Sequence, residues 1–189
     1  MCGRYTGNID ENEELRAIYK AALSAYPDTD FASGEIFPSN TVPLLTGIGG
    51  ILRPFAASWG FPTRDGKLII NARAETAAEK PIFAESFMRR RCIVPTTGYF
   101  EGSHKADRTK YLFNRLEHGI LYLGGLWLRY DDGVRFVILT TAANLSVSDI
   151  HHRMPLILTE DALVKWSTDV GYAKSFVTSE MPSLLHKAV

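Results

Sequence analysis

The sequence predicts an α+β fold: a single domain over residues 1–189, with a mostly antiparallel, barrel-like β-sheet and peripheral helices. Three observations lead to this expectation. A chain of 189 residues is long enough to bury one hydrophobic core. Most of its apolar segments are short runs separated by turns rich in glycine and aspartate, which is typical of strands. Only three segments carry helix signals, and we find no repeat, low-complexity tract or linker.

Three helices are expected, and each has a recognisable start or stop signal. Residues 10–26 place apolar side chains at helical spacing and acidic side chains in the first turn, and Pro27 ends the segment. A second helix is expected over residues 82–90, directly after a proline. A third is expected over residues 160–167, with Thr159 as its N-terminal cap and two acidic residues in its first turn.

Most of the remaining chain is expected to form strands. The expected strands are residues 42–46, 51–58, 68–70, 92–94, 98–101, 111–116, 120–130 and 134–141. Turns are expected at residues 47–50, at His118-Gly119 and at residues 131–133. Several of these strands look buried on both faces, so periodicity does not predict how they pair.

Composition limits the possible partners. Lysine and arginine total 21, as do aspartate and glutamate, so a nucleic acid would have to be held by a local group of arginines and not by a basic surface at large. The two cysteines, Cys2 and Cys92, show no metal-binding spacing, and we expect no metal and no cofactor. The sequence has no signal-peptide pattern and no apolar run long enough to cross a membrane. We expect a cytoplasmic monomer with reduced thiols.

Cys2 is the first candidate for chemistry. If Met1 is removed, which a small residue at position 2 favours, Cys2 carries a free α-amine and a thiol on one carbon skeleton. An aldehyde can then form a Schiff base with the nitrogen, and the sulfur can close on the imine carbon to give a thiazolidine. Taken alone, the position of Cys2 favours a small residue near the start without a role.

Polar side chains also occur where packing does not require them. Asn71 follows an apolar run and can point into a site at a strand end, with Arg73 two residues on; an Asx-turn is the alternative. Glu101 ends an aromatic run that can desolvate its carboxyl group; a water-facing glutamate on an edge strand is the alternative.

The segment from residue 149 to 158 is the richest polar cluster. It places His151, His152 and Arg153 between apolar runs. Histidine is the natural proton shuttle near neutral pH, and arginine can hold a phosphate with two parallel hydrogen bonds. The alternatives are surface histidines in a turn, or a metal pair, for which no third ligand has suitable spacing.

Four motifs occur here in one order. They are Cys-Gly-Arg-Tyr at residues 2–5, Asn-Ala-Arg-Ala-Glu-Thr at 71–76, Arg-Cys-Ile-Val-Pro with Gly-Tyr-Phe-Glu across 91–101, and Ile-His-His-Arg-Met-Pro at 150–155. This arrangement resembles the SRAP (SOS-response-associated peptidase) family, the abasic-site processing proteins. The similarity runs from Cys2 to about residue 158.

The resemblance implies a DNA-repair protein that crosslinks itself to abasic sites in single-stranded DNA, a lyase-type activity linked to the SOS response. It implies that Cys2 is the nucleophile, that Asn71 orients it, and that Glu101 and His151 form an acid/base pair. It further implies that the DNA backbone is held by Arg4, Arg73 and Arg153. Two alternatives remain open: a cysteine peptidase or autopeptidase in which Cys2 attacks an acyl carbon, and a non-covalent single-strand-binding module.

The chain also departs from the family pattern. Glu35-Ile36-Phe37-Pro38 stands where the family commonly has Asn-Val/Ile-Ala-Pro, Gly102 replaces a frequent tryptophan, and Thr63-Arg64 follows where paired tryptophans are frequent. Such aromatic side chains stack on bases. Phe37, Phe61 and Tyr99 are possible substitutes, but we expect all three in the core.

Overall fold

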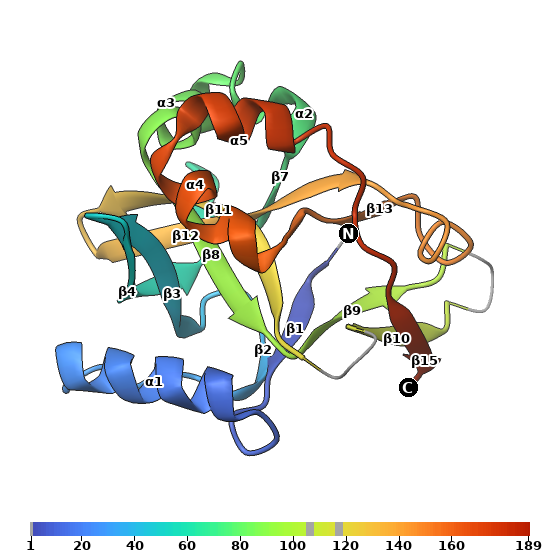
Figure 1. The fold of residues 1–189 in the computed structure, drawn as a ribbon, viewed down its shortest axis with the longest axis horizontal. Helices are drawn as coiled ribbons and strands as arrows, with labels where there is room; N and C mark the ends of the chain where they lie inside the picture. Colours follow the sequence, from blue (N-terminus) through green and yellow to red (C-terminus); the bar gives the residue numbers. More distant parts are fainter. Residues whose placement is uncertain (1, 105–107, 116–118) are drawn as a thin grey trace.

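A closed β-barrel forms the centre of the molecule (Figure 1). The computed structural model describes residues 2–104, 108–115 and 119–189. Five strands form the barrel. Each pairs with its neighbour around the ring, and the pairing of the first strand with the last closes it. In spatial order they are β12 (Gly133–Ala142), β4 (Ile51–Trp59), β3 (Thr41–Ile48), β8 (Arg91–Thr96) and β11 (Leu121–Tyr130). These pairings are antiparallel except that of β12 with β4, which is parallel.

Three short strands extend the barrel. They are β7 (Asn71–Arg73), β13 (Arg153–Pro155) and β14 (Ile157–Leu158). Strand β7 runs parallel to β12, with Ile138 opposite Asn71, while β13 pairs antiparallel with the end of β12, with Ala142 opposite Arg153. Strand β12 therefore positions β7 and β13, which are far apart in the sequence, at the same end of the fold.

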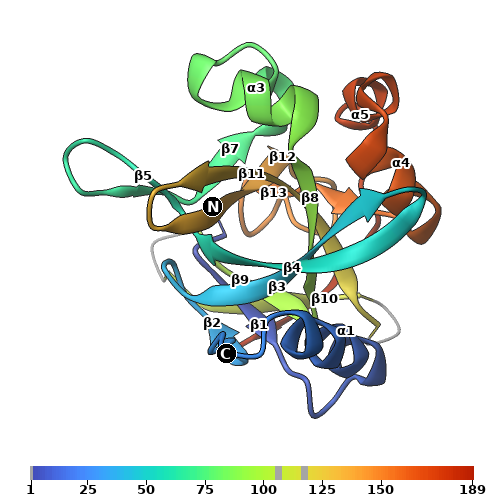
Figure 2. The ribbon, with the colours of Figure 1, turned by 90° about the vertical axis from the view of Figure 1, so that its left-hand side faces the viewer.

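A second, antiparallel sheet lies beside the barrel (Figures 1 and 2). Its order is β15 (Leu185–Ala188), β10 (Lys110–Asn114), β9 (Gly98–Gly102), β1 (Arg4–Gly7) and β2 (Gly34–Ile36). Tyr5, Tyr99 and Phe113 are neighbours across this sheet and are fully buried, with Tyr99 stacked on Phe113. Because side chains alternate along a strand, Arg4 and Phe100 project from the opposite face. A separate hairpin pairs β5 (Phe61–Pro62) with β6 (Leu68–Ile69).

The helices cover the outside. The helix α1 lies on the opposite side of the barrel from α3 and α5 (Figures 1 and 2). Its N-cap Asn12 accepts a hydrogen bond from the backbone of Leu15, and its buried face packs on β3 and β4. The helical segments are α1 (Glu13–Ala25), α2 (Ala74–Ala77), α3 (Pro81–Arg89), the 3-10 turn η1 (Glu160–Ala162), α4 (Leu163–Thr168) and α5 (Val170–Phe176). Within the described ranges, no helix is long and apolar enough to cross a membrane.

The expected α+β fold with a mostly antiparallel barrel and peripheral helices is confirmed, as are the first two helices and most strands. The turn expected at residues 47–50 is tighter than expected, because Ile48 pairs with Ile51 and leaves only Gly49 and Gly50, both at positive φ, in the turn. The third helix starts as a 3-10 turn, and Thr159 precedes it without a side-chain cap, so the expected cap is wrong.

Several short elements were not expected, namely β1, β2, β5, β7, β13, β14, β15, α2 and α5. Strand β10 ends at Asn114, so Arg115 of the expected strand 111–116 is not in the sheet. Residue 116 of that strand and His118 of the expected turn lie outside the described residues. Phe61 and Tyr99 are in the core as expected, but Phe37 is exposed.

A buried arginine joins two helices to the barrel. The guanidinium of Arg91, on β8, donates to the carbonyl oxygens of Phe87, Trp166 and Ser167. These carbonyls lie in the last turns of α3 and α4, where no further turn of helix can satisfy them. The positive charge of Arg91 therefore stabilises the C-terminal ends of both helices at once.

We expect Arg91→Met to lower the free energy of unfolding by about 3 kcal/mol, because it leaves buried helix-end carbonyls without donors. Chemical denaturation monitored by circular dichroism measures this. Arg89→Met, at an exposed position in the last turn of α3, is the control and should change stability by less than about 0.5 kcal/mol. A loss of stability in Arg91→Met no larger than in this control would contradict the role given to the guanidinium.

Candidate functional site

Cys2 lies at the start of the described chain, next to β1, and is buried, with 1% of its surface exposed. Its thiol Sγ donates to the backbone oxygen of Arg4 over 3.6 Å. Burial raises the pKa of the Cys2 thiol well above its usual range, and the negative charge of Glu101 raises it further, while the Arg4 backbone contact acts in the opposite direction. The thiol is therefore held in its protonated form at neutral pH.

Asn71 holds the backbone of Cys2. Its side-chain nitrogen Nδ2 donates to the carbonyl oxygen of Cys2 over 2.8 Å. Asn71 begins β7, whose register is fixed against Ile138 of the barrel, so the contact ties the segment before β1 to the rigid core. The side-chain oxygen Oδ1 of Asn71 is buried and has no hydrogen-bond partner within the described ranges. One end of the amide is thus used in positioning, and the other is available as an acceptor.

Glu101 lies on β9, two residues after Tyr99, and is buried. Its carboxylate oxygen Oε1 accepts a hydrogen bond from the backbone of Gly102. The charge of Glu101 acts on two other groups. It adds to the increase in the pKa of Cys2, and it opposes the decrease that burial causes in the pKa of His151. Glu101 is therefore electrostatically coupled to both the thiol and the imidazole.

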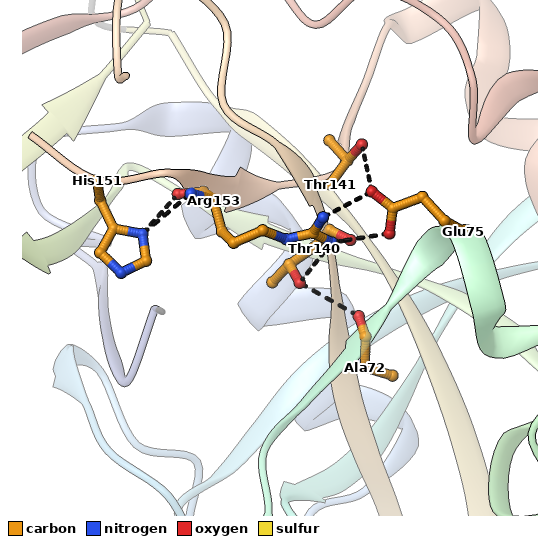
Figure 3. Close-up of polar contacts among 6 residues, drawn as sticks. All are labelled: Ala72, Glu75, Thr140, Thr141, His151 and Arg153. Atoms are coloured by element: carbon orange, nitrogen blue, oxygen red, sulfur yellow. Dashed lines mark hydrogen bonds and ion pairs between the residues drawn. The ribbon is translucent and has the colours of Figure 1, made fainter. Parts of the chain in front are cut away.

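His151 is buried, and its ring nitrogen Nδ1 faces both backbone groups of Arg153 (Figure 3). The N–H donor and the carbonyl acceptor of Arg153 each lie 3.1 Å from Nδ1. A neutral ring accepts from the N–H, and a protonated ring donates to the carbonyl. Burial lowers the pKa of His151, and the charge of Glu101 opposes this decrease. His151 therefore has a partner in either charge state, as a proton carrier requires.

A bidentate ion pair fixes the strand that follows His151 (Figure 3). The guanidinium of Arg153 donates to both carboxylate oxygens of Glu75 over 2.7 and 2.8 Å, and also to the carbonyl of Thr140. Thr141 donates to Glu75 as well. Burial alone would raise the pKa of Glu75, but the hydrogen bonds and charge of Arg153 bring it below its usual value. The network joins β13 to β12 and α2, and so positions His151.

The three arginines expected to hold DNA differ in whether they form an ion pair. Arg153 is paired with Glu75, and Arg4 is paired with Glu35 over 2.7 Å. The side chain of Arg73 is exposed and makes no hydrogen bond or ion pair with any described residue. Their role in DNA binding stays a prediction.

The fold thus brings Cys2, Asn71, Glu101 and His151 into one site. Cys2 and Asn71 touch directly, whereas Glu101 is coupled to Cys2 and His151 through its charge. Glu75 was not among the expected site residues, although it lies inside the motif that begins at Asn71; its carboxylate two residues after Arg73 was the available signal. In the part of the chain that the structure describes, no group of three or more histidine, cysteine, aspartate or glutamate side chains is placed to hold a metal ion.

The fold and the site define a class of small barrel proteins in which a buried cysteine just before an inner sheet strand is held by an amide and lies near a carboxylate that also acts on an imidazole. The chain belongs to the SRAP family, since the family model described as SOS response associated peptidase (SRAP) matches residues 1–184.

Relatives and solved structures agree with this assignment. The chain is 30% identical to the abasic site processing protein YoqW of Bacillus subtilis, over 94% of this chain and 86% of that protein. It is 28% identical to the abasic site processing protein YedK of Escherichia coli, over 88% of this chain and 79% of that protein. A protein of Bordetella bronchiseptica has the same fold, with a TM-score of 0.81 at 23% identity over 100% of this chain and 99% of that one.

We expect Glu101→Gln to lower the pKa of His151 further. The carboxylate stabilises the imidazolium, so its removal disfavours the charged form and leaves less of the ring protonated at a given pH. An NMR titration of the histidine ring signals measures this. Asp132→Asn, in the turn at the opposite end of β12 from Arg153, is the control and should leave the midpoint unchanged. A midpoint for His151 that stays constant or rises in Glu101→Gln would refute the coupling.

Proposed function

We propose that this protein captures abasic sites in single-stranded DNA through a covalent thiazolidine formed by Cys2 after loss of Met1. The observation that carries the proposal is the hydrogen bond from Asn71 to the carbonyl of Cys2, next to Glu101, whose charge acts on both the thiol and His151. The relatives YoqW and YedK are named abasic site processing proteins, and this supports the substrate class.

The reaction proceeds by condensation and needs no oxidant or reductant. The abasic deoxyribose opens to an aldehyde, and the α-amine of Cys2 adds to the aldehyde carbon. The resulting hydroxyl group leaves as water when it is protonated, which gives a Schiff base. The sulfur of Cys2 then bonds to the imine carbon, and the thiol proton ends on the nitrogen. The net change is the loss of one water molecule and the formation of one C–N and one C–S bond.

The site residues have separate tasks in this sequence. His151 assists ring opening, because it can exchange a proton near neutral pH and keeps a backbone partner in both charge states. The carboxylate of Glu101 takes a proton that the amine nitrogen loses, gives it to the departing hydroxyl, and then carries the proton of the thiol to the nitrogen. Since burial keeps the thiol protonated, a neighbouring carboxylate is needed when sulfur attacks. Asn71 fixes the Cys2 backbone, so that a slow bimolecular condensation becomes an oriented one.

Weak initial binding is sufficient for this function. Arginines on phosphates supply the encounter, and the covalent bond supplies the lifetime, so a net charge of zero is compatible with a DNA substrate. On this proposal, residues 1–189 act as one domain and as a cytoplasmic monomer without metal or cofactor.

Incubation of the Met1-processed protein with a single-stranded oligonucleotide that contains one abasic site should give an adduct that survives heating on a denaturing gel. Cys2→Ala should give none. Cys2→Ser keeps the amine but not the sulfur, and should give an adduct only after reduction with borohydride. Cys92→Ser, at a buried cysteine in the barrel, should react like wild type.

Three outcomes would overturn the proposal. They are no adduct from wild type, an equal yield from Cys2→Ala, and an intact mass showing that the reactive protein retains Met1. Complexes that vanish on denaturation would favour a non-covalent binding module.

A second candidate is self-cleavage by Cys2, which the word peptidase in the family description favours. Intact mass of protein made without methionine aminopeptidase distinguishes it, because self-cleavage requires that wild type loses Met1 and Cys2→Ala retains it.

We expect Asn71→Ala to slow adduct formation at saturating oligonucleotide by about 10- to 100-fold, because a small displacement of a reacting group has effects of this size. Single-turnover kinetics measure the rate, and fluorescence anisotropy should show unchanged binding of an intact oligonucleotide. Asn114→Ala is the matched control, since the amide of Asn114 likewise donates to a backbone carbonyl, that of Thr97. Equal rates in Asn71→Ala and Asn114→Ala would exclude a positioning role for Asn71.

A further inference from the structure

Arg4 is held from two directions on the outer face of the second sheet. Its guanidinium donates to the carboxylate of Glu35, on β2, over 2.7 Å. The same group lies over the Phe100 ring, 4.1 Å from its centroid, and 5.9 Å from the centroid of the exposed Phe37 ring. The aromatic contacts fix the plane of the guanidinium and leave its edge to Glu35. Glu35 takes one donor nitrogen, Nη1, so a phosphate that uses this nitrogen must displace the carboxylate, and a phosphate that binds the other donors lies beside its negative charge.

The Arg4–Glu35 pair is open to solvent and therefore exchangeable. The side chains are 23% and 48% exposed, respectively, and ion pairs of this kind stabilise proteins only weakly. Glu35 and Phe100 both line an open groove of about 710 Å³. A polyanion in this groove lies next to Glu35 and Phe100, the two neighbours of Arg4, and a phosphate can take two donors of the guanidinium where Glu35 takes one.

The ion pair between Arg153 and Glu75 is of a different kind. Its side chains are 13% and 39% exposed, and it also involves Thr140 and Thr141. That network supports the strand beside His151, so its disruption would alter the site itself. Glu35, in contrast, makes no hydrogen bond or ion pair with its side chain among the described residues other than that with Arg4. Of the two carboxylates, Glu35 is the one that can leave its arginine without disturbing the site.

We propose that Glu35 is a displaceable competitor for DNA phosphate at Arg4, and that it sets the affinity of this protein for single strands. This inference rests on the proposed function. With Glu35 in place, binding of a strand is an exchange of carboxylate for phosphate and gains little. Intact single strands are therefore bound weakly, and the protein distinguishes abasic from intact DNA by the covalent step at the aldehyde.

The test is equilibrium binding of an intact, labelled single-stranded oligonucleotide, measured by fluorescence anisotropy over a range of salt concentrations. Glu35→Gln should bind about two- to fivefold more tightly at low salt, because the cost of breaking the exposed pair is removed. The slope of log affinity against log salt should steepen by up to about 0.7, the value for one added phosphate contact on a single strand. With abasic oligonucleotide, the adduct rate should rise by the same factor below saturation and stay unchanged at saturation.

Asp132→Asn is the matched control. Asp132 pairs with Arg135. The side chain of Arg135 is 20% exposed and that of Asp132 is 57% exposed, close to the values for Arg4 and Glu35. The substitution Asp132→Asn removes one negative charge, as Glu35→Gln does, but at the opposite end of β12 from Arg153. A second arm repeats Glu35→Gln in an Arg4→Met background, where the gain in affinity should disappear if Glu35 acts through Arg4.

Two results would overturn the inference. One is an affinity of Glu35→Gln no higher than that of Asp132→Asn, which would indicate only a general charge effect. The other is a gain that persists in Arg4→Met. Because intact oligonucleotide cannot form an adduct, this test is separate from that of the proposed function, which fails if wild type does not crosslink abasic DNA.

Discussion

The arrangement of the molecule depends on strand β12, which pairs with four other strands. Its pairing with β11 closes the barrel, and its start runs parallel to β4. Further along, β12 sets the position of Asn71 through β7, and its end holds β13 with Arg153. The backbone hydrogen bonds of one rigid strand therefore determine both the core and the spacing of groups around Cys2. A slip of this strand by one residue would turn its own side chains, including Thr140 and Thr141, to the other face.

The groups around Cys2 are buried, and burial governs their chemistry. It keeps the thiol protonated and favours the neutral form of His151, while the charge of Glu101 opposes the second effect and adds to the first. Two of the arginines near the site are held by carboxylates, Arg153 by Glu75 and Arg4 by Glu35, while Arg73 is exposed. A substrate that binds either of the paired arginines must compete with a contact already made.

The sequence predicted the parts of the fold that depend on local signals. Long apolar strands such as β11 and β12, and the helix α1, carry their pattern within ten or so neighbouring residues. Strand β15 has no such pattern because it is exposed throughout, and β1 and β13 are too short to show periodicity. The contact between Asn71 and Cys2 joins residues 69 positions apart, and that between Glu75 and Arg153 joins residues 78 apart. Only the tertiary fold shows such pairs, and the parallel pairing of β4 with β12 is hidden for the same reason.

The two backbone groups that face Nδ1 of His151 have a kinetic consequence. In most sites a change of protonation state requires a ring flip, a new water or a shift of a neighbouring side chain. Here the donor and the acceptor belong to the same residue, and both are already in place. Little side-chain movement is therefore needed on the Nδ1 side of the ring, and proton exchange can stay at equilibrium while slower bond-forming steps take place beside it.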